Sequence, residues 1–168
     1  PADCVAVIGA RLAEALDYVH WSGLLHRDVK PANVMVSRLG EVKLMDFGIA
    51  KGAEDPSLTR VGMLVGSPSY MAPEVLAGDE GGPAADVWAL GVTLYELVCG
   101  EKPFRGANAD ELFRLVRRGR FRRVRSLAPG CPARVAAAIE RCLARSPERR
   151  WKSAGALARH LDAFAAKK

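Results

Sequence analysis

The sequence lacks an apolar run long enough to span a bilayer, and it lacks a basic leader. Its opening residues, PADCVAVIGARLAEA, carry an acid early and no cluster of lysine or arginine, which is not typical of a signal peptide. Apolar residues make up 49% and charged residues 26% of the 168, as in an ordinary globular domain with a core. Because the chain does not begin with Met, we expect it to be a segment of a longer protein.

Paired cysteines at metal-binding spacing are also absent. The sequence has four isolated cysteines and no C-x-x-C pair: Cys4, Cys99, Cys131 and Cys142. This spacing argues against both a zinc site and a disulfide framework. We expect small buried apolar side chains in a reducing compartment. The predicted location is the cytoplasm, for a free chain or for the cytoplasmic part of a membrane-anchored parent.

Positive charge is present but concentrated in one stretch. The net charge is +6, and seven arginines lie between Arg114 and Ser126, without which the rest of the chain would carry −1. Such a segment suits an acidic partner, a nucleic acid or a membrane surface. Only one aromatic residue, Phe121, lies among these arginines. We therefore interpret the stretch as a solvated helix end and loop, and expect no nucleic-acid binding.

Hydrophobic periodicity predicts about six helices. The first follows an Asp3 cap and ends near Gly23, with an apolar stripe at spacings of three and four formed by Val5, Ile8, Leu12, Leu16 and Val19. The other five are predicted within residues 72–78, 83–100, 108–119, 131–145 and 153–168. The segment 83–100 begins with proline, ends with glycine and is apolar almost all round, which is typical of a buried helix.

One β-hairpin is predicted between the first two helices. The runs NVMVS and EVKLM flank a turn centred near Leu39. Antiparallel pairing then puts Asn33 opposite Met45, so that Asn33 and Asp46 meet at the open end of the hairpin. Residues 46–70 are rich in Gly, Ser, Thr and Pro, and a loop of this length inside a domain is usually functional. The predicted fold class is mainly α, with this small hairpin carrying the polar loops.

Oxygen-bearing side chains and one lysine converge at that end of the hairpin. Asp28 lies on the preceding loop, five residues before Asn33, and Lys30 lies between them. Amide and carboxylate oxygens suit Mg²⁺ better than Zn²⁺. A metal on phosphates, a lysine on the transferring group and an aspartate facing a hydroxyl are the components of phosphoryl transfer. The alternative is that Asp28 and Asp46 form turns and that Lys30 is a surface lysine.

These residues stand in motifs that are similar to those of a known family. His26-Arg27-Asp28, Lys30, Asn33 and Asp46-Phe47-Gly48 resemble the catalytic and metal loops of the eukaryotic-like, or Hanks-type, protein kinases. GSPSYMAPE, DVWALGVTLYELVCGEKPF and PERR fit later motifs in order and spacing. The residues of these two loops, HRDVKPANVMV and MDFGIAK, are similar to those of the bacterial serine/threonine branch. The resemblance covers essentially residues 1–168, and only the large C-terminal lobe of the kinase domain, with an activation segment at 46–74.

The resemblance implies catalytic roles residue by residue. Asp28 would orient the substrate hydroxyl and accept its proton, and Lys30 would contact the transferring phosphoryl group of ATP. Asn33 and Asp46 would hold Mg²⁺, or Mn²⁺ in its place. The implied reaction transfers the γ-phosphate of Mg-ATP to a Ser or Thr hydroxyl of a protein substrate.

The resemblance also implies regulatory and structural roles. Arg27 would bind a phosphate on the activation loop, with Thr59 as its candidate acceptor; the alternative for Thr59 is an ordinary loop hydroxyl. Phe47 and Gly48 would set the pose of the metal loop, and Ser67 would stand where the family usually has a threonine. The structural residues would be four: His26 packed beside Phe47, Glu74 paired with Arg150, and Asp86 bound to the backbone at His26 and Arg27.

The motifs of the family's small lobe do not occur in these 168 residues. No G-x-G-x-x-G-x-V loop and no V-A-I-K strand is present. We therefore expect the missing small lobe to be supplied in cis by an active parent kinase, and these residues alone to be inactive. The alternative hypothesis is a non-catalytic, kinase-like binding or scaffold module, against which the intact Asp28, Lys30, Asn33 and Asp46 argue.

Overall fold

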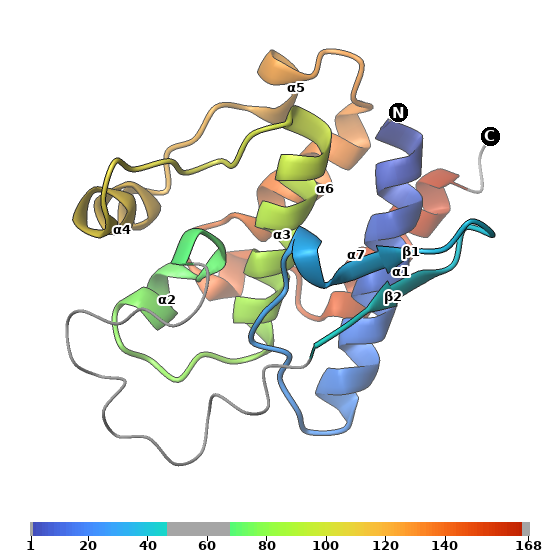
Figure 1. Cartoon of the computed structure of the whole chain (residues 1–168), viewed down its shortest axis with the longest axis horizontal. Coiled ribbons are helices and arrows are strands. Elements are labelled where there is room, and N and C mark those ends of the chain that lie inside the picture. The colour runs from blue at the N-terminus through green and yellow to red at the C-terminus, as the bar shows by residue number, and fades with distance from the viewer. Residues whose placement is uncertain (1, 47–67, 166–168) are drawn as a thin grey trace.

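A helical body carries one short β-hairpin (Figure 1). The structure is a computed structural model, and it describes residues 2–46 and 68–165. In chain order the elements are α1 (Ala2–Trp21), η1 (Pro31–Asn33), β1 (Val34–Val36), β2 (Val42–Leu44), η4 (Pro68–Tyr70), α2 (Pro73–Leu76), α3 (Pro83–Cys99), α4 (Ala109–Arg118), α5 (Val124–Leu127), α6 (Ala133–Cys142), η5 (Pro147–Arg149) and α7 (Ala154–Ala165).

The apolar stripe of α1 is buried, as its spacing predicts. Leu12 and Leu16 are fully buried, and Val5 and Val19 are buried beside them. This face of α1 packs against α7 and α3. Polar contact adds to the packing, because Asp17 Oδ1 accepts a hydrogen bond of 2.7 Å from the Gly155 amide at the start of α7. The first and last helices are thereby held together.

Helix α3 is the central element of the core. Every residue from Asp86 to Tyr95 is buried, so the helix is surrounded on all sides. It packs against α1 and α6, and Trp88 stacks on Phe104 with ring centroids 5.6 Å apart. Gly100 ends it with φ +73, a left-handed conformation that glycine adopts without steric cost. An acid buried in this helix, Asp86, therefore needs partners from elsewhere in the chain.

The hairpin has the register that its turn predicts. Strands β1 and β2 are antiparallel, with Val34 opposite Leu44 and Val36 opposite Val42. One step further, the Met45 amide donates a hydrogen bond of 2.8 Å to the Asn33 carbonyl oxygen. The predicted pairing of Asn33 with Met45 is confirmed, and Asp46 follows at the open end.

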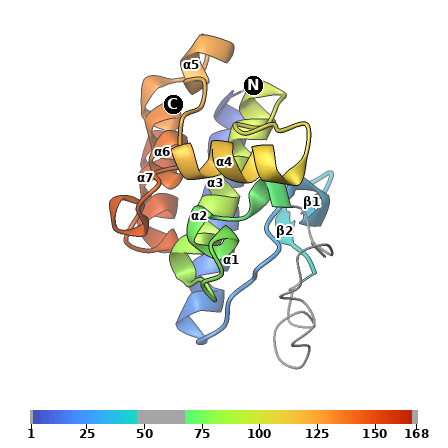
Figure 2. The same ribbon diagram turned by 90° about the vertical axis from the view of Figure 1, so that its left-hand side faces the viewer.

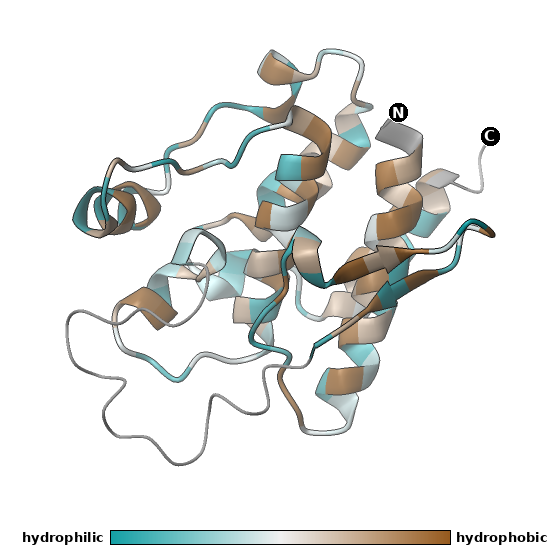
Figure 3. Cartoon of the chain, viewed as in Figure 1, coloured by the Kyte–Doolittle hydropathy of each residue, from teal (hydrophilic) through white to brown (hydrophobic). Residues whose placement is uncertain are grey.

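One side of the hairpin anchors it to the helical body. Val34, Val42 and Leu44 are partly buried against the core, and β2 contacts α1. Met35, on the opposite face, and Val36, at the end of β1, are about half exposed. Figure 3 shows the strands as mostly apolar ribbons lying over α1. The hairpin is thus a fixed platform for the loops at its open end.

Helix α4 lies across one side of the body, as Figure 2 shows. Its start is fixed on both sides of the Asn108 cap: Asn108 Oδ1 accepts a hydrogen bond of 2.9 Å from the Glu111 amide, and Glu111 Oε2 accepts one of 2.8 Å from the Ala107 amide. Gly119 ends it with φ +64.

The single turn α5 was not predicted, because four residues show no periodicity. It is held by the Val124 amide, which donates a hydrogen bond of 2.9 Å to Glu140 Oε1.

The predicted fold class is confirmed. The described residues form a mainly helical body with one two-stranded sheet, and they contain seven α-helices where the sequence predicts about six. None of the helices within residues 2–46 and 68–165 combines the length and apolar character required to cross a bilayer.

Close contact between α3 and α6 makes Gly91 a sensitive position. A Cβ at residue 91 would lie 2.4 Å from Cys142 Cβ, so Gly91→Ala must push the two helices apart. We expect a loss of about 1–3 kcal/mol in the free energy of unfolding, measured by urea denaturation. Gly130→Ala is the control, because its Cβ would meet no atom within 4 Å. Equal stability of the two variants would contradict the close packing of α3 on α6.

Candidate active site

The loop between α1 and the hairpin is held from below by one buried carboxylate. Asp86 of α3 is 3% exposed. Its Oδ2 accepts a hydrogen bond of 2.9 Å from the His26 amide, and its Oδ1 accepts one of 2.9 Å from the Arg27 amide. Arg27 has φ +64, a conformation that a non-glycine residue adopts only when its surroundings hold it there. Asp86 therefore ties the bend at Arg27 to the central helix.

A histidine that sequence analysis missed completes this contact. His20, near the end of α1, lies with Nε2 2.8 Å from Asp86 Oδ2, and both side chains are largely buried. Three donors therefore surround the buried carboxylate, which offsets its loss of hydration. Nothing in the helical periodicity marks His20, because it lies beside the apolar stripe and its partner is 66 residues away.

His26 links the loop to the hairpin through both ring nitrogens. Its Nε2 lies 3.1 Å from the Met45 carbonyl oxygen, which can only accept, so Nε2 carries the proton. Its Nδ1 then accepts from the Asp28 amide at 3.3 Å. Burial of the ring lowers the pKa of His26 below its usual 6.5, against the opposing effect of Asp86 and other nearby groups. The neutral ring is the form that satisfies both partners.

Asp28, Lys30 and Asn33 form one hydrogen-bonded cluster. Lys30 Nζ donates to Asp28 Oδ1 at 3.0 Å and to Oδ2 at 2.9 Å. Asn33 Nδ2 donates to the Asp28 carbonyl oxygen at 2.7 Å and to Oδ2 at 3.1 Å. Asn33 is buried, whereas the Asp28 and Lys30 side chains are 17% and 20% exposed. The three side chains that sequence analysis assigns to catalysis are brought together, with Asp28 and Lys30 at the surface of the loop.

Asp46 lies at the same end of the hairpin. It follows Met45, whose amide is bonded to the Asn33 carbonyl oxygen, and it is exposed. Its φ of +54 is left-handed, which aspartate tolerates better than most residues. Its charge raises the pKa of His26, which opposes the effect of burial on that ring. Asp46 is therefore the residue that follows Met45, the backbone partner of Asn33 in the hairpin.

The chemistry of this corner suits a hard divalent cation. The Asn33 amide nitrogen is engaged by Asp28, so the amide oxygen is the atom left to coordinate a cation. Asp46 adds a carboxylate, and oxygen ligands of this kind are the ones that Mg²⁺ prefers. Within the part of the chain that the structure describes, no three His, Cys, Asp or Glu side chains gather as a metal cluster. Asn33 and Asp46 would therefore supply only part of a coordination shell.

The regulatory residues are described in part. Arg27 is exposed, with its amide held by Asp86. Phe47, Gly48, Thr59 and Ser67 lie outside the described residues, as does most of the expected segment 46–74.

Glu74 and Arg150 form a buried ion pair. Arg150 is 1% exposed, and its Nη1 and Nη2 each donate to one Glu74 oxygen at 2.7 Å. The remaining guanidinium donors bond to backbone oxygens of Ala84, Ala144 and Arg145. A paired, two-pronged contact of this kind is strong and directional. It holds α2 against Arg150, the residue that follows η5.

Tyr70 and Glu96 form a further contact that sequence analysis missed. The Tyr70 hydroxyl donates to Glu96 Oε2 at 2.6 Å, and Lys102 Nζ lies 4.6 Å from the centre of the Tyr70 ring. Burial and the Glu96 carboxylate raise the pKa of Tyr70, so the hydroxyl remains a donor at neutral pH. This contact fixes η4 to the C-terminal part of α3, and no short-range pattern could have indicated a pair 26 residues apart.

Comparison with known proteins gives consistent matches. Residues 2–161 match the model of the protein kinase domain. Serine/threonine-protein kinase PknH of Mycobacterium tuberculosis is 40% identical over 158 residues, which cover 94% of this chain and 25% of that protein. Serine/threonine-protein kinase PknA of the same species is 40% identical over 152 residues, covering 90% and 34%. A crystal structure of Rad53 in complex with AMP-PNP aligns with a TM-score of 0.78 at 26% identity, covering 95% of this chain and 40% of that one. The chain thus spans about a quarter to a third of the length of these curated relatives.

The neutral state of His26 can be measured directly. Because burial lowers its native pKa, we expect its ring proton resonances to titrate with a midpoint below 6.5 in NMR spectra, after assignment with a His26→Gln variant. The unfolded chain binds a proton near pH 6.5 that the native ring resists. The stability contributed by neutral His26 is therefore complete above that pH and is lost as the pH falls toward the native pKa. A midpoint above 6.5 would contradict the buried, neutral ring.

Proposed function

The chain belongs to the protein kinase family, in its bacterial serine/threonine branch. From this premise we propose that it carries the catalytic and metal loops of an enzyme that uses Mg-ATP to phosphorylate Ser or Thr hydroxyls of proteins. The observation that carries the proposal is the cluster in which Lys30 Nζ bonds to both Asp28 oxygens and Asn33 bonds to Asp28. A surface turn has no need of such an arrangement, whereas phosphoryl transfer uses a carboxylate and a cation side by side.

Asp28 is the proposed proton acceptor. Its carboxylate is partly exposed at the loop surface, and Asn33 holds one of its oxygens from the buried side. A substrate hydroxyl approaching from solvent would donate to this carboxylate, which orients the hydroxyl for attack and takes up its proton. Asn33 fixes the direction of the Asp28 side chain.

Lys30 is the proposed phosphate contact. Its ammonium nitrogen lies 2.9 and 3.0 Å from the two Asp28 oxygens. A group bound by Asp28 would therefore lie close to the ammonium. In this position it adds positive charge beside the phosphoryl group as the bond to the hydroxyl forms. Asn33 and Asp46 are the proposed holders of Mg²⁺ or Mn²⁺, which would supply neutralising charge to the phosphates of ATP.

The regulatory part of the proposal concerns Arg27 and the segment 46–74. The exposed Arg27 guanidinium would bind a phosphate on that segment, with Thr59 as its acceptor, since arginine and phosphate form paired charge-assisted hydrogen bonds. Phe47, Gly48 and Ser67 keep the roles that the family resemblance implies. ATP and the four unpaired thiols both favour the cytoplasm as the compartment in which this chemistry operates.

Asp28 provides the test of the proposal. In the complete protein that contains these residues, we expect transfer of radiolabelled phosphate from ATP to a protein substrate to fall by roughly 10²–10⁴-fold in Asp28→Asn. The loss follows from removing the proton acceptor while keeping the shape of the side chain. Asp79→Asn is the matched control, because Asp79 is exposed and lies in the turn after α2. Its activity should equal that of the native protein.

The same assay separates the competing hypotheses. No transfer by the complete protein with Asp28 intact would favour a non-catalytic binding module. Residues 1–168 alone should show no measurable transfer, because they contain no glycine-rich loop or strand lysine to hold ATP. Turnover by residues 1–168 that disappears with Asp28→Asn would contradict that part of the proposal.

A further inference from the structure

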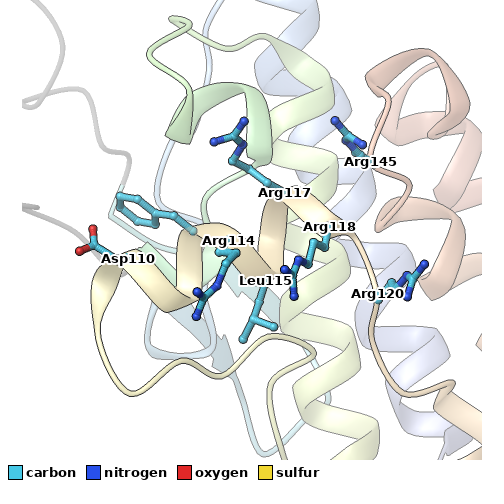
Figure 4. A pocket seen from close by; sticks show the side chains of 8 residues that line it. Asp110, Arg114, Leu115, Arg117, Arg118, Arg120 and Arg145 are labelled. Carbon is cyan, nitrogen blue, oxygen red and sulfur yellow. The ribbon is translucent and has the colours of Figure 1, made fainter.

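A pocket of about 970 Å³ lies beside α4, and arginine dominates its lining (Figure 4). Its charged lining residues are Asp110, Arg114, Arg117, Arg118, Arg120 and Arg145. The five arginines and one aspartate leave a net charge of +4 around a single cavity. In Figure 4, Asp110 lies at the end of α4 away from Arg120 and Arg145, so the carboxylate does not interrupt the arginines.

The sequence builds this lining from two distant segments. Arg114, Arg117 and Arg118 recur at spacings of three and four on α4, so their side chains share a face, while Leu112 and Val116 are buried on the other. The chain then turns at Gly119, where an added Cβ would lie 3.4 Å from Arg145 Cβ. The end of α4 and the chain at Arg145 are therefore in contact.

The position of Arg145 is fixed by the core. Buried Arg150 donates from Nη2 to the Arg145 carbonyl oxygen at 3.2 Å, while the same guanidinium is paired with Glu74. The backbone at Arg145 is thus held by the ion pair described above, and its side chain is exposed toward α4. The pocket is lined by a rigid helix and an anchored turn.

These five arginines differ from their sequence neighbours Arg122 and Arg123 in their partners. Arg123 lies 2.5 Å from Glu140, and Arg122 lies 3.7 Å from Glu101. Within the described residues, none of the five pocket side chains has an ion pair, although all five are exposed. An anion that enters the pocket therefore meets an excess of positive charge that no ion pair in this part of the chain neutralises.

A purely structural role accounts for only two of them. Arg117 and Arg118 occupy the last turn of α4, where cations interact favourably with the helix dipole. That effect falls off within one turn, so it does not explain Arg114, nor Arg120 and Arg145 on the neighbouring loops. The helix dipole therefore leaves the lining of one cavity by all five arginines unexplained, and a ligand would account for it.

We propose that this pocket binds an acidic segment of a protein partner, one with several closely spaced Asp or Glu side chains. Planar guanidinium groups match carboxylates in paired hydrogen bonds. Their spread over a helical turn and a second segment suits several carboxylates along an extended peptide. Half-buried Phe113 and Leu115 add an apolar lining for the peptide backbone and short side chains.

The lining favours a peptide over a nucleic acid. Sites for single-stranded nucleic acids combine positive charge with a row of aromatic rings on which bases stack. Phe113 is the one aromatic side chain that lines this pocket. The proposed binding does not depend on phosphoryl transfer, so it can be tested whether or not the chain is part of an active kinase.

Fluorescence anisotropy with a labelled peptide tests the proposal on residues 1–168. The probe is a peptide of alternating Glu and Gly, and the same peptide with Gln in place of Glu is its neutral counterpart. We expect the Glu peptide to bind at low salt and the Gln peptide not to bind. The triple variant Arg114→Ala, Arg118→Ala, Arg145→Ala should weaken binding by about tenfold or more, because three exposed charge pairs are lost.

A charge-matched triple variant is the control. Arg38, Arg134 and Arg159 are exposed arginines outside the pocket that form no ion pair within the described residues. Their simultaneous change to Ala lowers the net charge equally and should alter binding by less than about twofold, since the site is local. If the pocket triple variant does not fold, the single Arg118→Gln variant should still weaken binding by about threefold.

Several results would overturn the proposal. These are no binding of the Glu peptide, equal binding of the Glu and Gln peptides, and equal loss of affinity in the two triple variants. Tighter binding of a single-stranded DNA oligonucleotide with the same number of charges would assign the pocket to nucleic acid instead.

Discussion

The buried carboxylate of Asp86 is the contact on which the rest of the site depends. Removing a charged group from water is costly unless donors replace the water, and His20, His26 and Arg27 do so here. The two backbone donors are adjacent amides at a left-handed bend, so the carboxylate selects one conformation of the loop. Asp28 is the next residue, and its position follows from that bend. The chemistry at the surface is therefore set by an acid in the middle of the core.

A second buried ion pair, Glu74 with Arg150, plays the same part for the later half of the chain. It joins α2 to the residue that follows η5, and Arg150 also holds the backbone at Ala84 near the start of α3. Both networks thus end on or beside α3. Loops that carry function need rigid support, and one central helix provides it here for the loop at Asp28 and, through Arg145, for the arginine-lined pocket.

Local patterns predicted the elements well and the long-range contacts poorly. The spacing of Leu12 and Leu16 indicated the buried face of α1, and the turn at Leu39 set the pairing of Asn33 with Met45, because both are short-range consequences of backbone geometry. The partnership of His20 with Asp86 was missed, since a pair 66 residues apart leaves no periodic trace.

The arginines illustrate the same limit. The sequence shows seven between residues 114 and 125, but their count does not reveal that Arg122 and Arg123 have acidic partners in other segments. Nor does it reveal that Arg145 joins Arg114 and Arg118 around one cavity. Charge density is visible in a sequence, whereas its pairing is a property of the fold.

Amide hydrogen exchange in an Asp86→Asn variant tests the central claim most directly. The amide side chain offers one acceptor oxygen where the carboxylate offers two, so at least one of the His26 and Arg27 amides loses its partner. The account predicts that exchange at one or both of these amides accelerates by about tenfold or more relative to the Leu90 amide in the core of α3. Unchanged protection of both amides relative to Leu90 would show that Asp86 does not hold the loop.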